Sequence, residues 1–400
     1  MRALLTLVLL FCQEAPETLR LPDTEFARRR GDLVERLHDG ALAVDAGPLG
    51  EVGSDNNTPI FDFKYLTGFH DPEGILVLAG KKSAVFVSEP RTVAGIDAVL
   101  PVEKFAAWAE EHLGKQARIY TRLRGKNLSL LSKGAPSAEL IGSKLGLELV
   151  RMRLIKDEAE LRLMRKAADA TNAAHIAAMK TVKPGMNERA IHELIVATFK
   201  KEGCPELGFP PIVAAGLNGT VLHYMKNEKE IPKDTLMVVD IGAAIENYVT
   251  DITRTLPTSG TFSETQRVHY QCVLDAQKAA ESILKPGASF LTLEEAARKV
   301  FEERSLTKWS YAHSKDGLVR HSLGHTVGMA VHDSQSRNYS EPFKAGMVIT
   351  IEPGWYDKES GYGIRIEDTY VITADGFERL SAGAPREIDE IEKLMKKKDF

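Results

Sequence analysis

Four acidic residues and one histidine lie in five separate segments of the C-terminal half of the chain. They are Asp240, Asp251, His325, Glu352 and Glu367. Each acid is embedded in a strand-like apolar run, where an unpaired buried carboxylate would be strongly unfavourable. We therefore expect cations or hydrogen-bond donors to lie close to these acids in the folded protein.

Two hairpins could bring the four acids together. Asp240 and Asp251 are joined by a segment of hairpin length, and an antiparallel pair of strands would place both carboxylates in one region. Glu352 and Glu367 flank a second predicted hairpin, whose turn falls at residues 357–362. The pattern thus predicts two pairs of acids, each held by its own hairpin.

Four carboxylates and one imidazole could hold two divalent cations, with two of the carboxylates bridging them. A donor set that consists mostly of oxygen favours hard or borderline ions such as Mn²⁺ over a structural zinc bound by thiolates. Two cations would also offset the repulsion between the negative side chains. His321 and His325 have the spacing of a helical zinc pair, but Gly324 and Gly328 argue against a helix there.

Each of the five residues, taken alone, also has a structural explanation. An Asp after an apolar strand often caps a turn or a helix, a Glu in a strand often faces solvent, and a single His is often structural. The spacing alone leaves the two-metal site and these structural roles both open.

The elements that must position these residues differ between the two parts of the chain. Residues 21–150 alternate short apolar strands, such as 74–79 and 83–87, with helical stretches, including one at 105–114. This alternation indicates a smaller N-terminal α/β domain.

From residue 151 onward the pattern of predicted secondary structure changes. Long helices are predicted at 157–182 and 187–201, and further helices follow a strand-rich stretch. That stretch contains predicted strands at 236–239 and 248–255, and the later helices are predicted at 264–284 and 293–303. We expect residues 151–400 to form a larger α+β domain that carries all the candidate ligands.

The bulk composition agrees with a two-domain globular protein. The chain has 400 residues, which exceeds the size at which a single core usually stops growing. Hydrophobic residues make up 43% and charged residues 27%, and the formal net charge is -4. This balance gives no indication of a nucleic-acid partner or of an anionic membrane. The three cysteines form no metal-binding or disulfide pattern, and we expect Cys204 and Cys272 to be buried thiols.

Residues 1–20 differ from the rest of the chain. Arg2 precedes an apolar run at 3–11, which is the pattern of a secretory signal peptide and would export the protein to the periplasm or beyond. A flexible N-terminus is the alternative, and the protein would then be cytoplasmic. The run is too short to span a bilayer, and no other run is long enough, so we expect no stable membrane insertion.

The five segments together resemble those of the pita-bread metallopeptidases, which include aminopeptidase P, prolidase and methionine aminopeptidase. They occur in the family's order, with all five ligand types intact, and read VVDIG, TDITRT, GHTVG, TIEPG and GIRIED. The resemblance covers residues 151–395 and, more loosely, the preceding part. It implies a C-terminal pita-bread catalytic domain preceded by a creatinase-like α/β domain.

The resemblance implies a role for each ligand. Asp240 would chelate the first metal, Asp251 and Glu367 would bridge both metals, and His325 and Glu352 would complete the second. A hydroxide shared by the metals would attack the scissile carbonyl, and Glu352 would shuttle its proton. One metal would hold the free amine of the peptide, so that cleavage occurs only at an N-terminus.

It also implies residues on the substrate side of the site. His223 would donate to the developing oxyanion, and His332 would contact the substrate near the scissile bond. His321 matches a histidine near the proline pocket, Tyr356 would line that pocket, and Arg365 would bind carboxylates in or beside the site. Each of them could instead support the site structurally.

Within the family, the sequence favours aminopeptidase P, which releases the N-terminal residue from peptides with proline in second position. The runs GMAVHD at 328–333 and LSAGAPREI at 380–388 look like those of bacterial aminopeptidase P. Prolidase, an Xaa-Pro dipeptidase with the same metal set, is the alternative, and a non-catalytic peptide-binding relative is a remote one. The family further implies two divalent ions, Mn²⁺ or else Co²⁺ or Zn²⁺, and a homodimer or homotetramer.

Overall fold

The computed structural model describes residues 19–46, 58–312, 321–333 and 339–396. The apolar run predicted as a signal peptide lies outside these ranges. None of the helices that the structure describes is long and apolar enough to cross a membrane. Cys204 and Cys272 are buried free thiols, as predicted.

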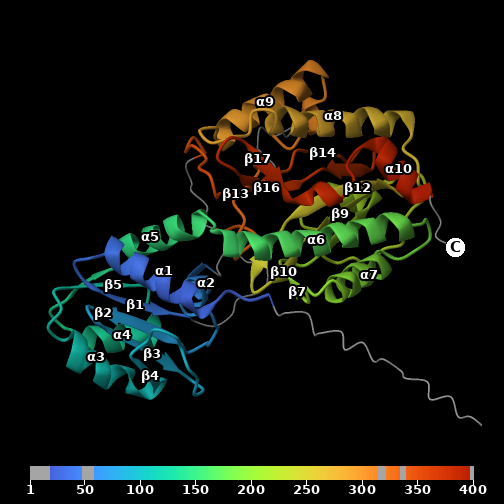
Figure 1. Cartoon of the computed structure of the whole chain (residues 1–400). Helices are drawn as coiled ribbons and strands as arrows, with labels where there is room; N and C mark the ends of the chain where they lie inside the picture. The colour runs from blue at the N-terminus through green and yellow to red at the C-terminus, as the bar shows by residue number, and fades with distance from the viewer. Residues whose placement is uncertain (1–18, 47–57, 313–320, 334–338, 397–400) are drawn as a thin grey trace, which may run out of the picture.

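The first part of the chain forms one mixed six-stranded sheet with helices on both faces (Figure 1). The strand order is β4-β3-β2-β1-β5-β6, and β2 pairs antiparallel with both β1 and β3. The strands are β1 (Ala41–Asp45), β2 (Ile75–Ala79), β3 (Lys82–Val87), β4 (Ala98–Pro101), β5 (Arg118–Thr121) and β6 (Glu139–Ile141). The helices are α1 (Asp23–Arg36), α2 (Thr58–Thr67), η2 (Val102–Lys104), α3 (Phe105–Leu113), α4 (Gly125–Gly134) and α5 (Ser143–Leu154).

Alternate residues of the central strands face the two helical layers. Ala41 and Ala43 of β1 belong to the apolar cluster that includes α3 and α4, whereas Leu42 and Val44 belong to the one that includes α1 and α5. A strand whose two faces are both covered is buried at every position, as β1 and β2 are, and its residues are apolar throughout except for Asp45 at the end of β1.

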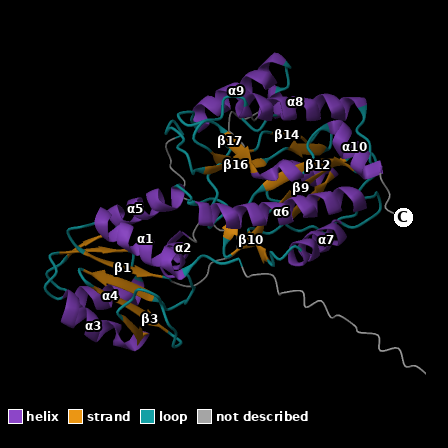
Figure 2. Cartoon of the chain, viewed as in Figure 1, coloured by secondary structure: helices purple, strands orange, loops and turns teal. Residues whose placement is uncertain are grey.

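The second part of the chain places short sheets between two layers of helices, which Figure 2 shows as strands with α6 and α7 on one side and α8 and α9 on the other. Its strands are β7 (Glu206–Leu207), β8 (Ile212–Ala215), β9 (Leu236–Ile241), β10 (Ala243–Ile245), β11 (Tyr248–Val249), β12 (Ile252–Pro257), β13 (Val348–Ile351), β14 (Gly354–Asp357), β15 (Tyr362–Arg365), β16 (Asp368–Ile372) and β17 (Phe377–Arg379). Its helices are α6 (Glu158–Thr181), α7 (Glu188–Lys201), η3 (Gly216–Thr220), α8 (Glu264–Glu281), α9 (Phe290–Glu303), η4 (Thr307–Trp309), η5 (Leu380–Gly383) and α10 (Ile388–Lys396).

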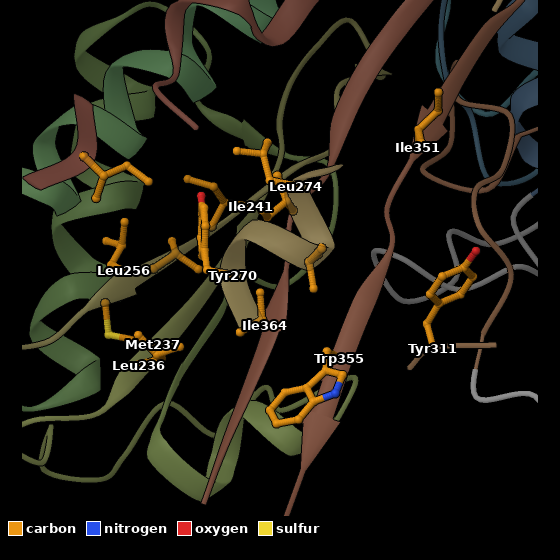
Figure 3. Close-up of a cluster of buried hydrophobic side chains, with 14 of the residues drawn as sticks. Leu236, Met237, Ile241, Leu256, Tyr270, Leu274, Tyr311, Ile351, Trp355 and Ile364 are labelled. Atoms are coloured by element: carbon orange, nitrogen blue, oxygen red, sulfur yellow. The ribbon is translucent and has the colours of Figure 1, made fainter. Parts of the chain in front are cut away.

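The core of this part lies between α8 and the strands. Figure 3 shows Tyr270 and Leu274 of α8 beside Ile241 and Leu256 of β9 and β12. All four side chains are fully buried. The strands that carry the candidate ligands are therefore held from behind by a continuous apolar layer.

Both predicted hairpin pairings are present. Strands β9 and β12 pair antiparallel in the order β12-β9-β8, and β14 pairs with β15 across a turn that begins at Asp357 and ends at Tyr362. The predicted helix at 157–182 is α6, which begins at a capping box formed by Asp157 and Glu160.

Several predicted boundaries are wrong; the helix predicted at 264–284, for example, ends at Glu281. The strand predicted at 248–255 is two strands, β11 and β12, which pair with different partners and are separated at Thr250 and Asp251. The helix predicted at 293–303 begins earlier, at Phe290, because Ser289 forms a capping box with Thr292.

One guanidinium joins the two parts of the chain. Arg153 of α5 donates from one nitrogen to Asp62 of α2 at 2.8 Å and from another to Asp333, and all three side chains are 1% exposed. The contact holds the segment that carries His332 against the first part of the chain.

We predict that Arg153→Met lowers the free energy of unfolding by about 3–5 kcal/mol, because two buried carboxylates lose their shared cation. Urea titrations followed by circular dichroism measure this. Arg151→Met is the matched control, since Arg151 lies on the same helix, is 64% exposed and pairs with Glu148 at the surface. We expect that control to cost no more than about 1 kcal/mol. Equal losses in the two variants would contradict the prediction.

Candidate metal centre

The backbone places the acids at the points where strands end. Asp240 lies in β9, opposite Thr253 of β12, and Asp251 lies in the break just before β12. Glu352 follows β13 directly, and Glu367 precedes β16 directly. Side chains at such ends can leave the pleat and meet the ends of neighbouring sheets.

An isolated antiparallel bridge joins the two sheets at the acids themselves. Thr253 of the first sheet exchanges backbone hydrogen bonds with Glu367 of the second, at 3.3 and 3.0 Å. The hydroxyl of Thr253 also donates to the Glu367 carboxylate at 2.6 Å. The two predicted acid pairs are thereby brought to one place.

His325 reaches the same place from the loop beside β13. Its backbone exchanges hydrogen bonds with Thr350, and its Nε2 atom lies 3.3 Å from Glu352 Oε1. The same Nε2 atom is 3.5 Å from Asp251 Oδ2 and 3.8 Å from Glu367 Oε1. Asp251, His325 and Glu367 each offer one ligand atom, and these atoms all lie within 4.8 Å of one another.

Asp240 borders this group through a different contact. Its Oδ2 atom accepts a hydrogen bond of 2.5 Å from Arg365, whose guanidinium also donates to the hydroxyl of Tyr356 at 3.2 Å. Tyr356 in turn lies 2.8 Å from Nε2 of His321. A continuous chain of hydrogen bonds therefore leads from Asp240 to His321.

The electrostatics of the group fit bound cations. Burial raises the pKa of Asp251, Glu352 and Glu367 well above the ordinary values, and each is raised further by a neighbouring carboxylate. Burial lowers the pKa of His325 to about 3, so its imidazole is neutral and can serve as a ligand. The site concentrates acids that repel one another unless positive charge lies between them.

Three buried oxygens of this group have no hydrogen-bond partner among the residues that the structure describes. They are Asp240 Oδ1, Asp251 Oδ1 and Glu367 Oε1. Buried carboxylate oxygens without donors are costly in a folded protein, and a divalent ion would satisfy them. The donors present therefore fit a site for divalent metal.

Two of the predicted substrate-side histidines border the cluster. The ring of His332 packs edge to face on that of His325, with centroids 4.4 Å apart, and His321 Nδ1 is 3.7 Å from Glu352 Oε2. His223 is exposed, and within the described residues no hydrogen bond or ion pair joins it to the cluster. It follows the turn η3, which packs so closely on β15 that a Cβ at Gly363 would lie 1.9 Å from the Gly219 oxygen.

Several polar residues at the site have no counterpart in the sequence-based prediction. Arg254 and Asp368 form a fully buried ion pair of 2.6 Å beside the cluster, and Arg254 also donates to the Glu367 carbonyl. Both are charged residues in apolar strand runs, the same signal that identified the acids, and they could have been found by it.

Glu188 is a second residue that the sequence did not reveal. It is fully buried at the start of α7, and it accepts hydrogen bonds from Tyr224 and from the backbone nitrogens of Ala215 and Lys229. It therefore fixes the segment that contains His223. Acids are common in the first turn of a helix, so its position carried no distinguishing signal.

Comparisons with known proteins place this site in context. The sequence profile of metallopeptidase family M24 matches residues 162–374. Escherichia coli Xaa-Pro aminopeptidase is 30% identical over an alignment of 432 positions, gaps included, which covers 93% of this chain and 97% of the relative. The mitochondrial intermediate cleaving peptidase 55 of Arabidopsis thaliana is 30% identical over 407 residues, covering 93% and 82%. The structure of zinc-substituted E. coli aminopeptidase P in complex with product superposes with a TM-score of 0.83 at 29% identity, covering 94% of this chain and 98% of that one.

Proposed function

Since this chain belongs to metallopeptidase family M24, we propose that it is a metal-dependent exopeptidase that releases the N-terminal residue from peptides with proline in second position. The observation that carries the proposal is the convergence of Asp251, His325, Glu352 and Glu367 from four separate segments around one imidazole nitrogen. The similarity to an Xaa-Pro aminopeptidase over nearly the whole of both chains supports the substrate class.

We propose that two divalent ions, Mn²⁺ in preference to Co²⁺ or Zn²⁺, are held by the five residues Asp240, Asp251, His325, Glu352 and Glu367. The predominance of carboxylate oxygen and the absence of a thiolate from this donor set support a hard or borderline ion. Such ions, when bound, lower the pKa of water towards neutrality and polarise a carbonyl group.

Glu352 is the proposed proton carrier. Its side chain is 14% exposed, compared with 2% for Glu367, so it borders the open side of the cluster. Its Oε1 atom faces His325, whereas its Oε2 atom lies nearer His321, on the substrate side. A carboxylate that borders the open side of the site can take up a proton at Oε2 and return it to the leaving amine.

The proposed substrate-side roles belong to five further residues. His332 contacts the substrate near the scissile bond, and His223 donates to the developing oxyanion. His321 and Tyr356 border the proline pocket. Arg365, already bonded to Asp240, orients that acid and offers its remaining donors to carboxylate groups beside the site.

A panel of peptides tests the proposal and separates it from its alternative, an Xaa-Pro dipeptidase. We expect release of the first residue from an Xaa-Pro-Yaa tripeptide and no release from the matched Xaa-Ala-Yaa peptide, measured by chromatography after reconstitution with Mn²⁺. Cleavage of the Xaa-Pro dipeptide alone would identify a dipeptidase. Failure to cleave any of the peptides at full metal occupancy would contradict both activities.

We also propose the domain organisation, the export and the oligomeric state of the protein. Residues 21–150 form the smaller α/β domain and residues 151–400 form the catalytic domain, a division that the change of sequence pattern near residue 151 supports. Helix α5 (Ser143–Leu154) crosses this boundary. The apolar run at 3–11 supports export by a signal peptide at 1–20. The homodimer or homotetramer is proposed from the family resemblance.

A further inference from the structure

A fully buried glutamine on α8, Gln277, contacts both backbone segments that lead to the glutamates of the metal centre. Gln277 Nε2 donates to the carbonyl oxygen of Ile351 at 3.0 Å and to that of Ile366 at 3.2 Å. These two residues immediately precede Glu352 and Glu367. One side-chain amide therefore ties together the two segments that present these acids.

The Gln277 amide lies just beyond the end of the ladder that pairs β13 with β16. The ladder between β13 and β16 ends at the pair Ile351 and Asp368. Beyond it, the backbone nitrogen of Glu352 donates to Leu323, and that of Glu367 donates to Thr253. A long backbone bond of 3.4 Å, from Ile366 to Pro353, accompanies the two bonds from Gln277. The β14–β15 ladder begins again at the pair Gly354 and Arg365, so the Gln277 amide bridges the gap between the two ladders, at the acids themselves.

The orientation of the amide is itself fixed. Gln277 Oε1 accepts a hydrogen bond of 3.0 Å from Arg386, and a guanidinium can only donate. Arg386 is held in turn by Asp368 at 2.8 Å and by Glu281 at 2.7 Å. The oxygen of Gln277 must face Arg386, so both amide hydrogens must face the two carbonyls.

We propose that Gln277 is a positioning residue that sets the separation of Glu352 and Glu367 and thereby the affinity of the site for its metal ions. The inference rests on the proposed function, because it assumes that these two acids are ligands. Removing a residue that orients metal ligands typically weakens metal binding by about 10–100-fold. We expect a loss of about the same size for Gln277.

The test compares Gln277→Met, which keeps the length of the side chain and removes both donors, with Gln271→Met. Gln271 lies on the same helix, and its amide donates to Asp275 at 2.7 Å, away from the strands. We expect Gln277→Met to weaken Mn²⁺ binding about 10–100-fold in isothermal titration calorimetry of the full chain. Gln271→Met should bind as the wild type does. Activity of Gln277→Met should recover at saturating Mn²⁺, and the exchange-coupled electron paramagnetic resonance signal of the ion pair should change.

A second variant covers poor folding of the first. Gln277→Glu keeps the shape of the side chain and its contact with Arg386 but removes both donors, and it should weaken binding in the same direction. Wild-type affinity in a folded Gln277 variant, or equal losses in Gln271→Met, would overturn the inference and leave the proposed function standing. A wild-type protein that binds no divalent ion would overturn both.

Discussion

Glu367→Gln is expected to reduce kcat/KM for an Xaa-Pro-Yaa peptide by about 10³-fold or more. The Glu367 carboxylate is 2% exposed, accepts a hydrogen bond from Thr253, and lies 3.8 Å from His325. Glutamine keeps its size but removes the charge that two cations would share, and metal catalysis contributes several kcal/mol, at about 1.4 kcal/mol for each tenfold change in rate. Peptide assays measure the loss, and elemental analysis of the purified variant should show a reduced metal content.

Glu378→Gln is the control for this experiment. Glu378 is an acid of the same type in the same sheet, but its side chain is 40% exposed and it pairs with Arg165 at the surface. We expect this variant to retain wild-type activity and metal content. Full metal content together with full activity in Glu367→Gln would remove Glu367 from the proposed ligand set.

Glu352→Gln is expected to have opposite effects on the stability of the metal-free and metal-loaded protein. Burial, together with the charge of Glu367, raises the pKa of Glu352 well above its ordinary value of 4.5. A group of this kind stabilises the folded state fully below its unfolded pKa, and that stability is lost as the pH rises through the folded pKa. Glutamine does not titrate, so the metal-free variant should become progressively more stable than the metal-free wild type above pH 4.5.

The gain should grow by at most about 1.4 kcal/mol for each pH unit, until the folded pKa of Glu352 is passed. Thermal unfolding in chelator at several pH values measures it, and the histidines cancel because both proteins contain them. With saturating metal, the wild type should be the more stable of the two, since ligand binding to the folded state stabilises it. A metal-free variant that never exceeds the wild type would show that the Glu352 charge is not disfavoured in the empty site.

The hairpins and the identities of the acids could be predicted because both depend on local signals. Antiparallel pairing of β9 with β12 follows from two apolar runs joined by a short connection, and the turn of β14 with β15 follows from its polar residues. Acids in apolar runs indicate burial and thus a need for partners. His325 alone carried no such signal, and it could be suspected only because it occurs together with the four acidic segments.

Other features depend on contacts between distant segments. The bridge between Thr253 and Glu367 joins two sheets, and no local pattern shows that these strands meet. The break at Asp251 arises because β11 and β12 pair with different strands, although their sequence reads as one run. Gln277 occupies a helical position that could equally have held an apolar residue, and its function depends on two carbonyls far along the chain.

The ion triad of Asp62, Arg153 and Asp333 limits which substitutions related proteins can accept at these positions. Losing the arginine leaves two buried anions, and losing either acid leaves the arginine short of a counter-ion, so single changes at these positions are unfavourable intermediates. The three positions should therefore covary across related proteins. Because Asp333 adjoins His332, selection to keep His332 in place should also restrict substitutions at Asp62 in the first part of the chain.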